Sequence, residues 1–278
     1  MTSPPAEAEP TDGGPLFAPL TARSVLLSIL LGTHPPELPV RTLVRLAEVF
    51  GVSEGTARVA LSRLGSDGDV VGTDGVYRLS PRLLSRQAEQ DRGVRPVTRR
   101  WRGGWELVVA GPELSAGERS AVGSRLGRLR FAELRPGVWG RPDNLVRSWA
   151  SELPAGSWLF SGRLGTDDPT PAELAGRLWD LEGWAITAES LISALQASRD
   201  PAEGFVVAAA IVRHLRDDPV LPPALLPNRW PGTQLRGAYD EYRRRLRELM
   251  RQERDRSSGT VGPRPGDVSP EEPWCRPR

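Results

Sequence analysis

The chain has 278 residues with 37 basic and 35 acidic side chains, and every basic one is an arginine because the sequence contains no lysine. The missing lysine excludes Schiff-base chemistry and nucleotide-binding loops of the G-x-x-x-x-G-K-[ST] type, while the single cysteine, Cys275, excludes a disulfide or a thiolate metal site within the chain. The only histidines, His34 and His214, are too few for a histidine-rich metal site, and no apolar run is long enough to span a bilayer.

Residues 1–19 are expected to form a disordered leader. They carry three acidic residues and no basic one, whereas a signal peptide begins with positive charge followed by an apolar stretch. We therefore expect a cytoplasmic protein.

All nine tryptophans lie at or after Trp101, which marks a change of composition near residue 100. We divide the rest into blocks at residues 20–95, 100–168 and 170–256, followed by a disordered tail at residues 257–278 that is rich in Gly, Pro and Ser.

The first block predicts a small helical unit closed by a β-hairpin. Apolar residues recur at helical spacing in three segments, and Ser53 is a good N-cap for the third. A short turn at residues 51–53 joins the second and third helices, and the hairpin follows them. This order is typical of a winged helix-turn-helix. The expected elements are helices after Thr21 and Pro39, a helix from Glu54 to about Leu64, strands at 69–72 and 76–79, and a helix opened by Pro81.

The third helix of this block is a candidate recognition helix for DNA. Arginine forks pair with guanine edges or phosphates, and Ser and Thr hydroxyls contact either. Residues 20–100 contain twelve arginines against eight acids, so a positive surplus lies in the block that has this shape. The alternative is a helix-turn-helix module that binds protein through a solvated arginine-rich face. The predicted DNA-contacting residues are Thr56, Arg58, Ser62 and Arg63 on the helix and Arg78 beside the hairpin.

The second block predicts the element order β-α-β-β-α-β, which is typical of a ferredoxin-like split unit. Ser115 and Glu118 resemble a capping box at the start of its first helix. We expect Asp143 to cap the second helix, which would include Leu145, Val146 and Trp149. The expected strands are residues 105–109, 132–135, 138–141 and 158–160.

The third block is expected to be helical, so that the chain as a whole is α+β. A continuous apolar run at residues 205–212 predicts a helix that is buried on most sides. Asp217 and Asp218 are a tempting metal-binding pair, but no third ligand is evident nearby, and aspartates before prolines commonly cap or turn. We expect a structural role for them, packing for His214, and packing or a dimer contact for the arginine-rich last helix. The expected helices are residues 173–179, 181–197, 203–215 and 233–256.

Several segments resemble the PaaX family of bacterial transcriptional repressors. The most specific is Arg213-His-Leu-Arg-Asp-Asp-Pro-Val-Leu-Pro-Pro-Ala-Leu-Leu-Pro-Asn-Arg-Trp-Pro-Gly232, which is similar to the family's DDP-x-LP-x-x-LLP-x-x-WPG run. The segment from Leu134 to Pro142 resembles the family's PGVW segment, and the segment from Gly51 to Leu64 resembles its recognition-helix region. The resemblance covers residues 20–250.

This resemblance implies an N-terminal winged helix, a central ferredoxin-like domain similar to the Cas2 fold, and a helical C-terminal domain. It also implies a homodimer that binds a palindromic operator in double-stranded DNA, and it extends the DNA-reading role to Ser53. The implied effector is a coenzyme A thioester, although the resemblance assigns no effector-binding residues. No cofactor, metal or membrane partner and no enzymatic activity are expected.

A metal-dependent nuclease is the alternative that the Cas2 resemblance raises. Such nucleases use an aspartate at the end of the first strand of this fold. Here that strand ends at Val109-Ala110-Gly111, and the next carboxylate is Glu113. The sequence therefore favours the repressor over the nuclease.

Overall fold

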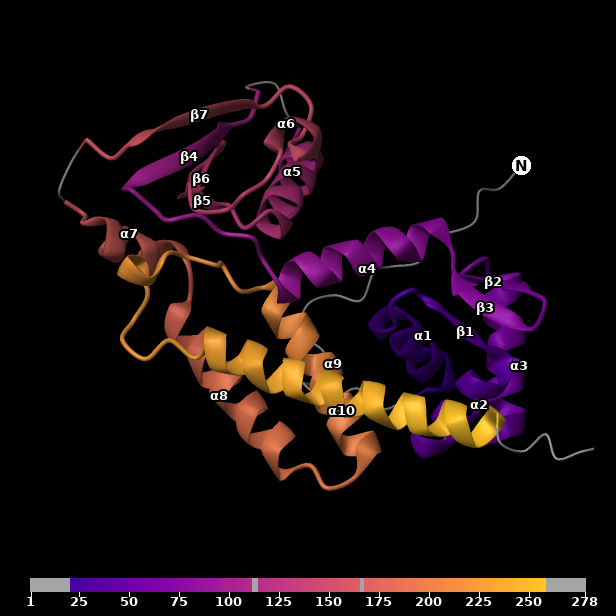
Figure 1. Ribbon diagram of the computed structural model, residues 1–278. Coiled ribbons are helices and arrows are strands. Elements are labelled where there is room, and N and C mark those ends of the chain that lie inside the picture. The colour runs from indigo at the N-terminus through magenta and orange to yellow at the C-terminus, as the bar shows by residue number, and fades with distance from the viewer. Residues whose placement is uncertain (1–20, 112–114, 166–167, 259–278) are drawn as a thin grey trace, which may run out of the picture.

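The structure is a computed structural model that describes residues 21–111, 115–165 and 168–258. The predicted leader and nearly all of the predicted tail lie outside these ranges, as do Cys275 and Glu113. The described chain is α+β, with helices at both ends and two antiparallel sheets, one of three strands and one of four (Figure 1).

Four helices and a three-stranded sheet form the first part of the chain. Thr21 caps the first helix in a capping box, Ser53 caps the third, and Gly51 between the second and third has φ +78°, as their sequences predict. The short strand β1 pairs with β3 and was not predicted, because three residues next to prolines carry no alternation to recognise. The elements are α1 (Ala22–Gly32), β1 (Glu37–Pro39), α2 (Val40–Val49), α3 (Glu54–Ser66), β2 (Val70–Thr73), β3 (Val76–Leu79) and α4 (Pro81–Val94).

The core of this first part is completed by the C-terminal helices. Leu26, Leu46 and Leu64, from α1, α2 and α3, are fully buried in it. Phe205 and Met250, which lie much further along the chain, belong to the same cluster. Burying such apolar side chains contributes about 1.5–3 kcal/mol each. The first part is therefore stabilised by packing against the C-terminal helices.

The central sheet has the strand order β5-β6-β4-β7, and all its neighbours are antiparallel. Val108 of β4 packs with Leu126 of α5 and Trp149 of α6, so these two helices cover one face. Strand β7 is one of the two edge strands, and each of its residues is exposed. The predicted order of elements is confirmed, and the capping box at Ser115 with it. The elements are β4 (Gly104–Val109), α5 (Ala116–Arg128), β5 (Ala132–Arg135), β6 (Val138–Pro142), α6 (Trp149–Glu152) and β7 (Trp158–Arg163).

The helix predicted to start at Asp143 is wrong. Residues 143–148 are not helical, and α6 has only four residues, beginning at Trp149. The backbone of this segment lies against the preceding linker instead. Val146 N–H donates to Val97 O, Arg99 N–H donates to Asn144 O at 2.7 Å, and Thr98 forms an isolated bridge with Leu145. These long-range hydrogen bonds replace the helical ones.

The C-terminal part is helical, and its long last helix runs along α8 and α9 and then reaches α2 in the first part of the chain (Figure 1). Helix α8 has the bounds predicted for it, and α9 is buried on most sides, as its apolar run predicts. The segment around η1 crosses back to the central sheet, where Leu221 and Leu225 pack with Trp105. The elements are α7 (Pro171–Leu178), α8 (Leu181–Ala197), α9 (Pro201–Arg216), η1 (Pro223–Leu225) and α10 (Gly232–Ser258).

Candidate nucleic-acid interface

Helix α3 is fixed to the first part of the chain by one apolar stripe. Ala57, Leu61 and Leu64 recur at helical spacing and are between 0% and 1% exposed. Ser53 Oγ accepts a hydrogen bond from Thr56 N–H at the start of the helix. The remaining residues of α3 therefore have their side chains on the outside of the molecule.

All five residues predicted on or just before α3 are exposed. Arg58 lies beside Glu54, with 2.7 Å between Nη2 and Oε1, and this i,i+4 pair is about half exposed. Among the described residues, no carboxylate lies within ion-pair distance of Arg63. Val59, which is 54% exposed, lies on the same surface. The structure thus brings Ser53, Thr56, Arg58, Ser62 and Arg63 together on one convex helix surface.

Arg78 is placed on a different element from these residues. It lies on β3, the middle strand of the first sheet, opposite Glu37 of β1 and Val71 of β2. This is the outer face of the sheet, because Leu79 and Val70 occupy the inner one. Its Nε lies 4.0 Å from Glu37 Oε2, and both side chains are about half exposed. The ion pair of Arg78 with Glu37 can therefore be broken at low energetic cost.

A buried carboxylate supports the turn after α3, and the sequence did not indicate it. Asp69 has a side chain that is only 2% exposed, and it pairs with Arg23 of α1 and Arg82 of α4. Arg23 also contacts Asp67, with 2.6 Å between Nη1 and Oδ2. Asp69 thereby ties the start of the hairpin to α1 and α4, which fixes the hairpin relative to α3.

The basic linker between the first part and the central sheet is largely engaged within the chain. Arg95 Nη2 lies 2.6 Å from Asp240 Oδ1 of α10. Arg99 Nε donates to Asp143 O at 2.6 Å, and its Nη2 lies 3.8 Å from Glu106. These two arginines hold the linker to its neighbours, while Arg100 is exposed.

Two buried arginines lie between the central sheet and the C-terminal helices. Arg141 is fully buried near the rings of Phe131 and Trp149, and desolvation lowers its pKa to about 9. Desolvation likewise lowers the pKa of Arg130 to about 10. Arg130 Nε donates to Asp218 O at 2.7 Å, and Arg141 donates to backbone carbonyls and to Asn144 Oδ1. Both remain charged at neutral pH, and Arg130 joins the central sheet to the end of α9.

The aspartate pair at the end of α9 has the structural role expected for it. The Asp218 side chain is 1% exposed, and its Oδ2 lies 2.7 Å from Arg236 Nη2 of α10. Its Oδ1 accepts the N–H of Val220 at 2.7 Å, which closes the turn. Asp217 is exposed. Among the residues that the structure describes, no group of three His, Cys, Asp or Glu side chains is placed to hold a metal ion.

The two histidines have different surroundings, and His214 packs as the sequence predicts. His214 stacks on Trp184 with ring centroids 4.4 Å apart, and Trp184 stacks in turn on Trp230 of the WPG segment. Burial lowers the pKa of His214. His34 is exposed, and its Nε2 lies 2.8 Å from Asp91 Oδ2. His214 is thus a packing residue, whereas His34 lies at a surface that includes α4.

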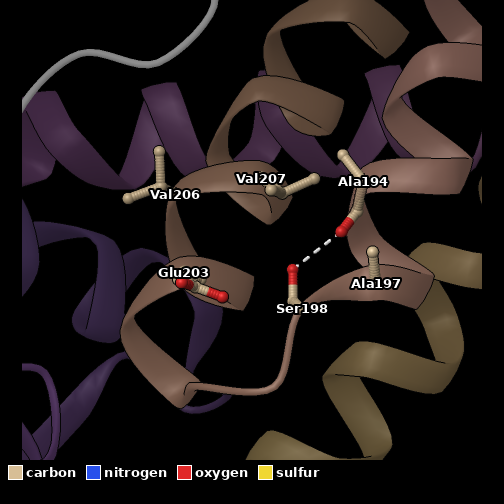
Figure 2. Close-up of a pocket in the computed structure, with 6 residues that line it drawn as sticks. All are labelled: Ala194, Ala197, Ser198, Glu203, Val206 and Val207. Carbon is tan, nitrogen blue, oxygen red and sulfur yellow. Dashed lines mark hydrogen bonds between the residues drawn. The ribbon is translucent and has the colours of Figure 1, made fainter.

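Two cavities lie outside the α3 surface. Figure 2 shows the smaller, of about 350 Å³, where the α8–α9 turn leaves a shallow hollow and Ser198 Oγ donates to Ala194 O. Its lining is mainly aliphatic, with Glu203 as the one charged side chain. The larger, of about 770 Å³, is a cleft between α1, α4 and α10 that contains five arginines.

No helix in the described ranges has the length and apolar character needed to cross a membrane.

Comparisons with known proteins identify the family. The family model for PaaX-like protein matches residues 21–83, and that for the PaaX-like protein C-terminal domain matches residues 180–253. A solved structure of uncharacterized protein Rv0674 from Mycobacterium tuberculosis is 44% identical, with a TM-score of 0.73, and the match covers 86% of this chain and 99% of that one. No match is found among the curated proteins. The two family matches and the structural relative together show that this chain belongs to the PaaX-like proteins.

Proposed function

We propose that the chain is a dimeric, sequence-specific DNA-binding repressor of transcription that acts in the cytoplasm and has no catalytic activity. Membership of the PaaX-like proteins suggests a regulator. The observation that carries the DNA-binding role is the exposed polar surface of α3, with Thr56, Arg58, Ser62 and Arg63 outside and an apolar stripe inside. Such a surface presents both base-reading and phosphate-binding groups.

In this proposal the first part of the chain is a winged helix-turn-helix. Helices α2 and α3, joined by a turn at residues 50–53, are the helix-turn-helix, and the hairpin of β2 and β3 is the wing. Helix α3 enters the major groove, where Arg58 and Arg63 pair with guanine edges or phosphates. Ser53, at the N-terminus of α3, and Arg78, on the wing sheet, contact the backbone.

The proposed dimer is formed by the central domain, with the ferredoxin-like (Cas2-like) fold that the resemblance implies. Its edge strand β7 exposes Trp158 (59%), Leu159 (39%) and Phe160 (53%). Trp158 lies opposite Val109 of β4 and Phe160 opposite Leu107, so they form an apolar surface on the face away from α5. An unpaired edge with large apolar side chains is a ready site for a second copy. A two-fold dimer would place two copies of α3 on a palindromic operator.

The proposed repressor is released from DNA by a small-molecule effector, and the family resemblance suggests a coenzyme A thioester. A ligand shifts the protein away from DNA only if it binds more tightly to an arrangement that misplaces the two α3 helices. The C-terminal helices are suited to transmit such a change, because Phe205 and Met250 are part of the core beneath α1 and α2.

The salt dependence of binding to a fluorescent 30-base-pair duplex tests the DNA-binding role. Because arginine–phosphate contacts release counterions, the affinity should fall steeply with salt. Arg58→Ala and Arg63→Ala should weaken binding, and each should reduce the slope by about 1 if the arginine that it removes binds a phosphate. Arg177→Ala, which removes an exposed arginine of α7, is the matched control and should leave the slope unchanged.

A flat plot of log affinity against log salt would contradict DNA binding and would favour a protein-binding module. The same duplex incubated with Mg²⁺ or Mn²⁺ tests the absence of catalysis. Cleavage that depends on the added metal would contradict that part of the proposal.

A further inference from the structure

The larger cleft is formed by three segments that lie far apart in the sequence. Its lining includes the C-terminal end of α1 with His34, the last turn of α4 with Arg92 and Arg95, and the middle of α10 with Arg243 and Arg247. Met250 and Arg251 complete the α10 side. Residues 243, 247, 250 and 251 recur at helical spacing, so α10 turns one face toward the cleft.

This cleft carries more positive charge than its own ion pairs neutralise. It contains five arginines, and Asp91 is the one carboxylate in its lining. Asp240 engages Arg95, and Glu248 engages Arg251. Within the described ranges, Arg92 and Arg247 have no carboxylate within ion-pair distance, although Arg247 Nε donates to Arg243 O at 3.3 Å. The helix ends of α1 and α4 add only about half a negative charge each. The cleft is therefore cationic.

We propose that this cleft binds a small molecule carrying two or more phosphate groups. Arginine guanidinium groups bind phosphate oxygens with two parallel hydrogen bonds, and arginines on opposite walls suit a ligand whose phosphates contact both. The volume of about 770 Å³ is within the usual range for sites of nucleotide-sized ligands. Arg92 and Arg247 are the arginines with the most freedom to turn toward the ligand.

The position of the cleft favours a small anion over the DNA backbone as its occupant. Helix α4 begins beside the β2–β3 hairpin and runs away from it to the cleft (Figure 1). Its 14 residues span about 21 Å, which separates Arg92 and Arg95 from the start of α4 beside the hairpin by most of a helix length. The arginines on this wall of the cleft thus lie away from the surface that we assign to DNA.

Ligand binding here would also control the orientation of the first part of the chain. One wall belongs to α1 and α4, and the other to α10, whose Met250 packs in the core beneath α1 and α2. The contacts His34–Asp91 at 2.8 Å and Arg95–Asp240 at 2.6 Å already link these elements. A phosphate ligand that bridges α4 and α10 would draw them together and turn α3. This regulatory step rests on the proposed DNA-binding function, whereas the binding site does not.

Titration calorimetry on the full chain without DNA tests the site. Inorganic pyrophosphate and coenzyme A are the two probes, and they distinguish recognition of phosphates alone from recognition of a nucleotide. Both should bind, with coenzyme A the tighter. The variant Arg92→Gln/Arg247→Gln should weaken both at least tenfold, and Arg245→Gln, an exposed arginine of α10 outside the cleft lining, should stay within twofold of the wild type. The thermal unfolding midpoints should match, because the two substituted cleft arginines are exposed.

Absence of binding by both probes, or equal binding by the double variant and the wild type, would overturn the proposal. A second readout is the affinity of the double variant for DNA without any added anion. A double variant that binds DNA as tightly as the wild type supports the proposal. A double variant with lower DNA affinity would show that the cleft arginines contact the DNA backbone and would overturn it. If the wild-type chain binds the two probes in calorimetry but has no affinity for DNA, the anion site is established and only the proposed DNA-binding function is refuted.

Discussion

Asp218 joins three parts of the molecule through different atoms of one residue. Its backbone oxygen accepts from Arg130 of the central domain, its Oδ2 lies against Arg236 of α10, and its Oδ1 closes the turn after α9. A buried carboxylate is stable only when such partners compensate its desolvation. Asp218 of the DDP segment therefore fixes the position of the C-terminal helices on the central sheet.

His214 makes the stability of this junction depend on pH. Burial lowers its pKa in the folded state below the usual value of 6.5, so the unfolded chain takes up the proton first as the pH falls. The stability that His214 contributes is complete above about pH 7 and is lost progressively as the pH falls from the unfolded-state pKa through the lower folded-state pKa. In a His34→Gln background, where His214 is the one remaining histidine, the free energy of unfolding in urea should fall between pH 7.5 and 5.5.

The matched control for this prediction is His34→Gln/His214→Phe. Phenylalanine keeps an aromatic ring stacked on Trp184 but does not titrate, so the fall should be smaller. Equal losses of unfolding free energy in the two variants would show that His214 does not titrate differently on folding.

Single residues could be predicted from the sequence where local periodicity decides their environment. The exposure of Arg58 and Arg63 follows from the apolar stripe of α3. The burial of Asp69 does not, because its partners Arg23 and Arg82 lie 46 and 13 residues away and meet it only in the tertiary structure. The cleft arginines were missed for the same reason, since α4 and α10 are separated by more than 130 residues.

At the scale of elements, β7 is unusual because it is an edge strand without a buried residue. Leu159 and Ser161 are directed toward the face that α5 and α6 cover, while Trp158 and Phe160 are on the other face. Exposed aromatic side chains on an unpaired edge favour association. The strand is the element on which the proposed dimer depends.

Trp158→Glu/Phe160→Glu should convert the dimer to a monomer in sedimentation velocity experiments. Burying two carboxylates in an apolar interface without partners costs several kcal/mol, which opposes association through this strand. Ile186→Glu, at an exposed apolar residue of α8 that is 62% exposed, is the control and should remain dimeric. If Trp158→Glu/Phe160→Glu sediments as a dimer like the Ile186→Glu control, and both have the circular dichroism spectrum of the wild type, the interface lies elsewhere.

Most helices and strands could be predicted because caps, turns and apolar spacing agree within each segment, as at Thr21, Ser53 and Ser115. The two failures are at residues 37–39 and 143–148. Strand β1 exists because β3 provides its hydrogen-bond partners, and the segment after Asp143 is extended because the linker at residues 97–99 provides them. Neither partner is visible in the local sequence.

At the scale of the whole molecule, the first part of the chain and the C-terminal helices share one hydrophobic core. Phe50, just after α2, packs against Phe205 of α9 with ring centroids 4.5 Å apart. The three blocks indicated by composition are therefore not three independent cores. This arrangement lets a change at α9 or α10 reach α3.

Phe50→Leu and Phe205→Leu should each lower the free energy of unfolding by about 1 kcal/mol. Because the rings are in contact, the double variant should deviate from additivity by at least about 0.5 kcal/mol in urea unfolding. Phe50→Leu with Phe131→Leu is the control pair, because Phe131 lies in the core of the central sheet. Its two changes in unfolding free energy should be additive. Additivity in both pairs would mean that the first part and α9 unfold independently.

Selection of binding sites from a random duplex library tests the central claim most directly. The wild-type chain should enrich a palindromic sequence whose half-sites are separated by one or more helical turns, since a two-fold dimer would present α3 twice on one face of the DNA. The variant Arg58→Ala/Arg63→Ala should lose this enrichment while Arg177→Ala keeps it. Enrichment of no sequence by the wild type, or the same enriched sequence for the double variant, would contradict sequence-specific recognition by α3.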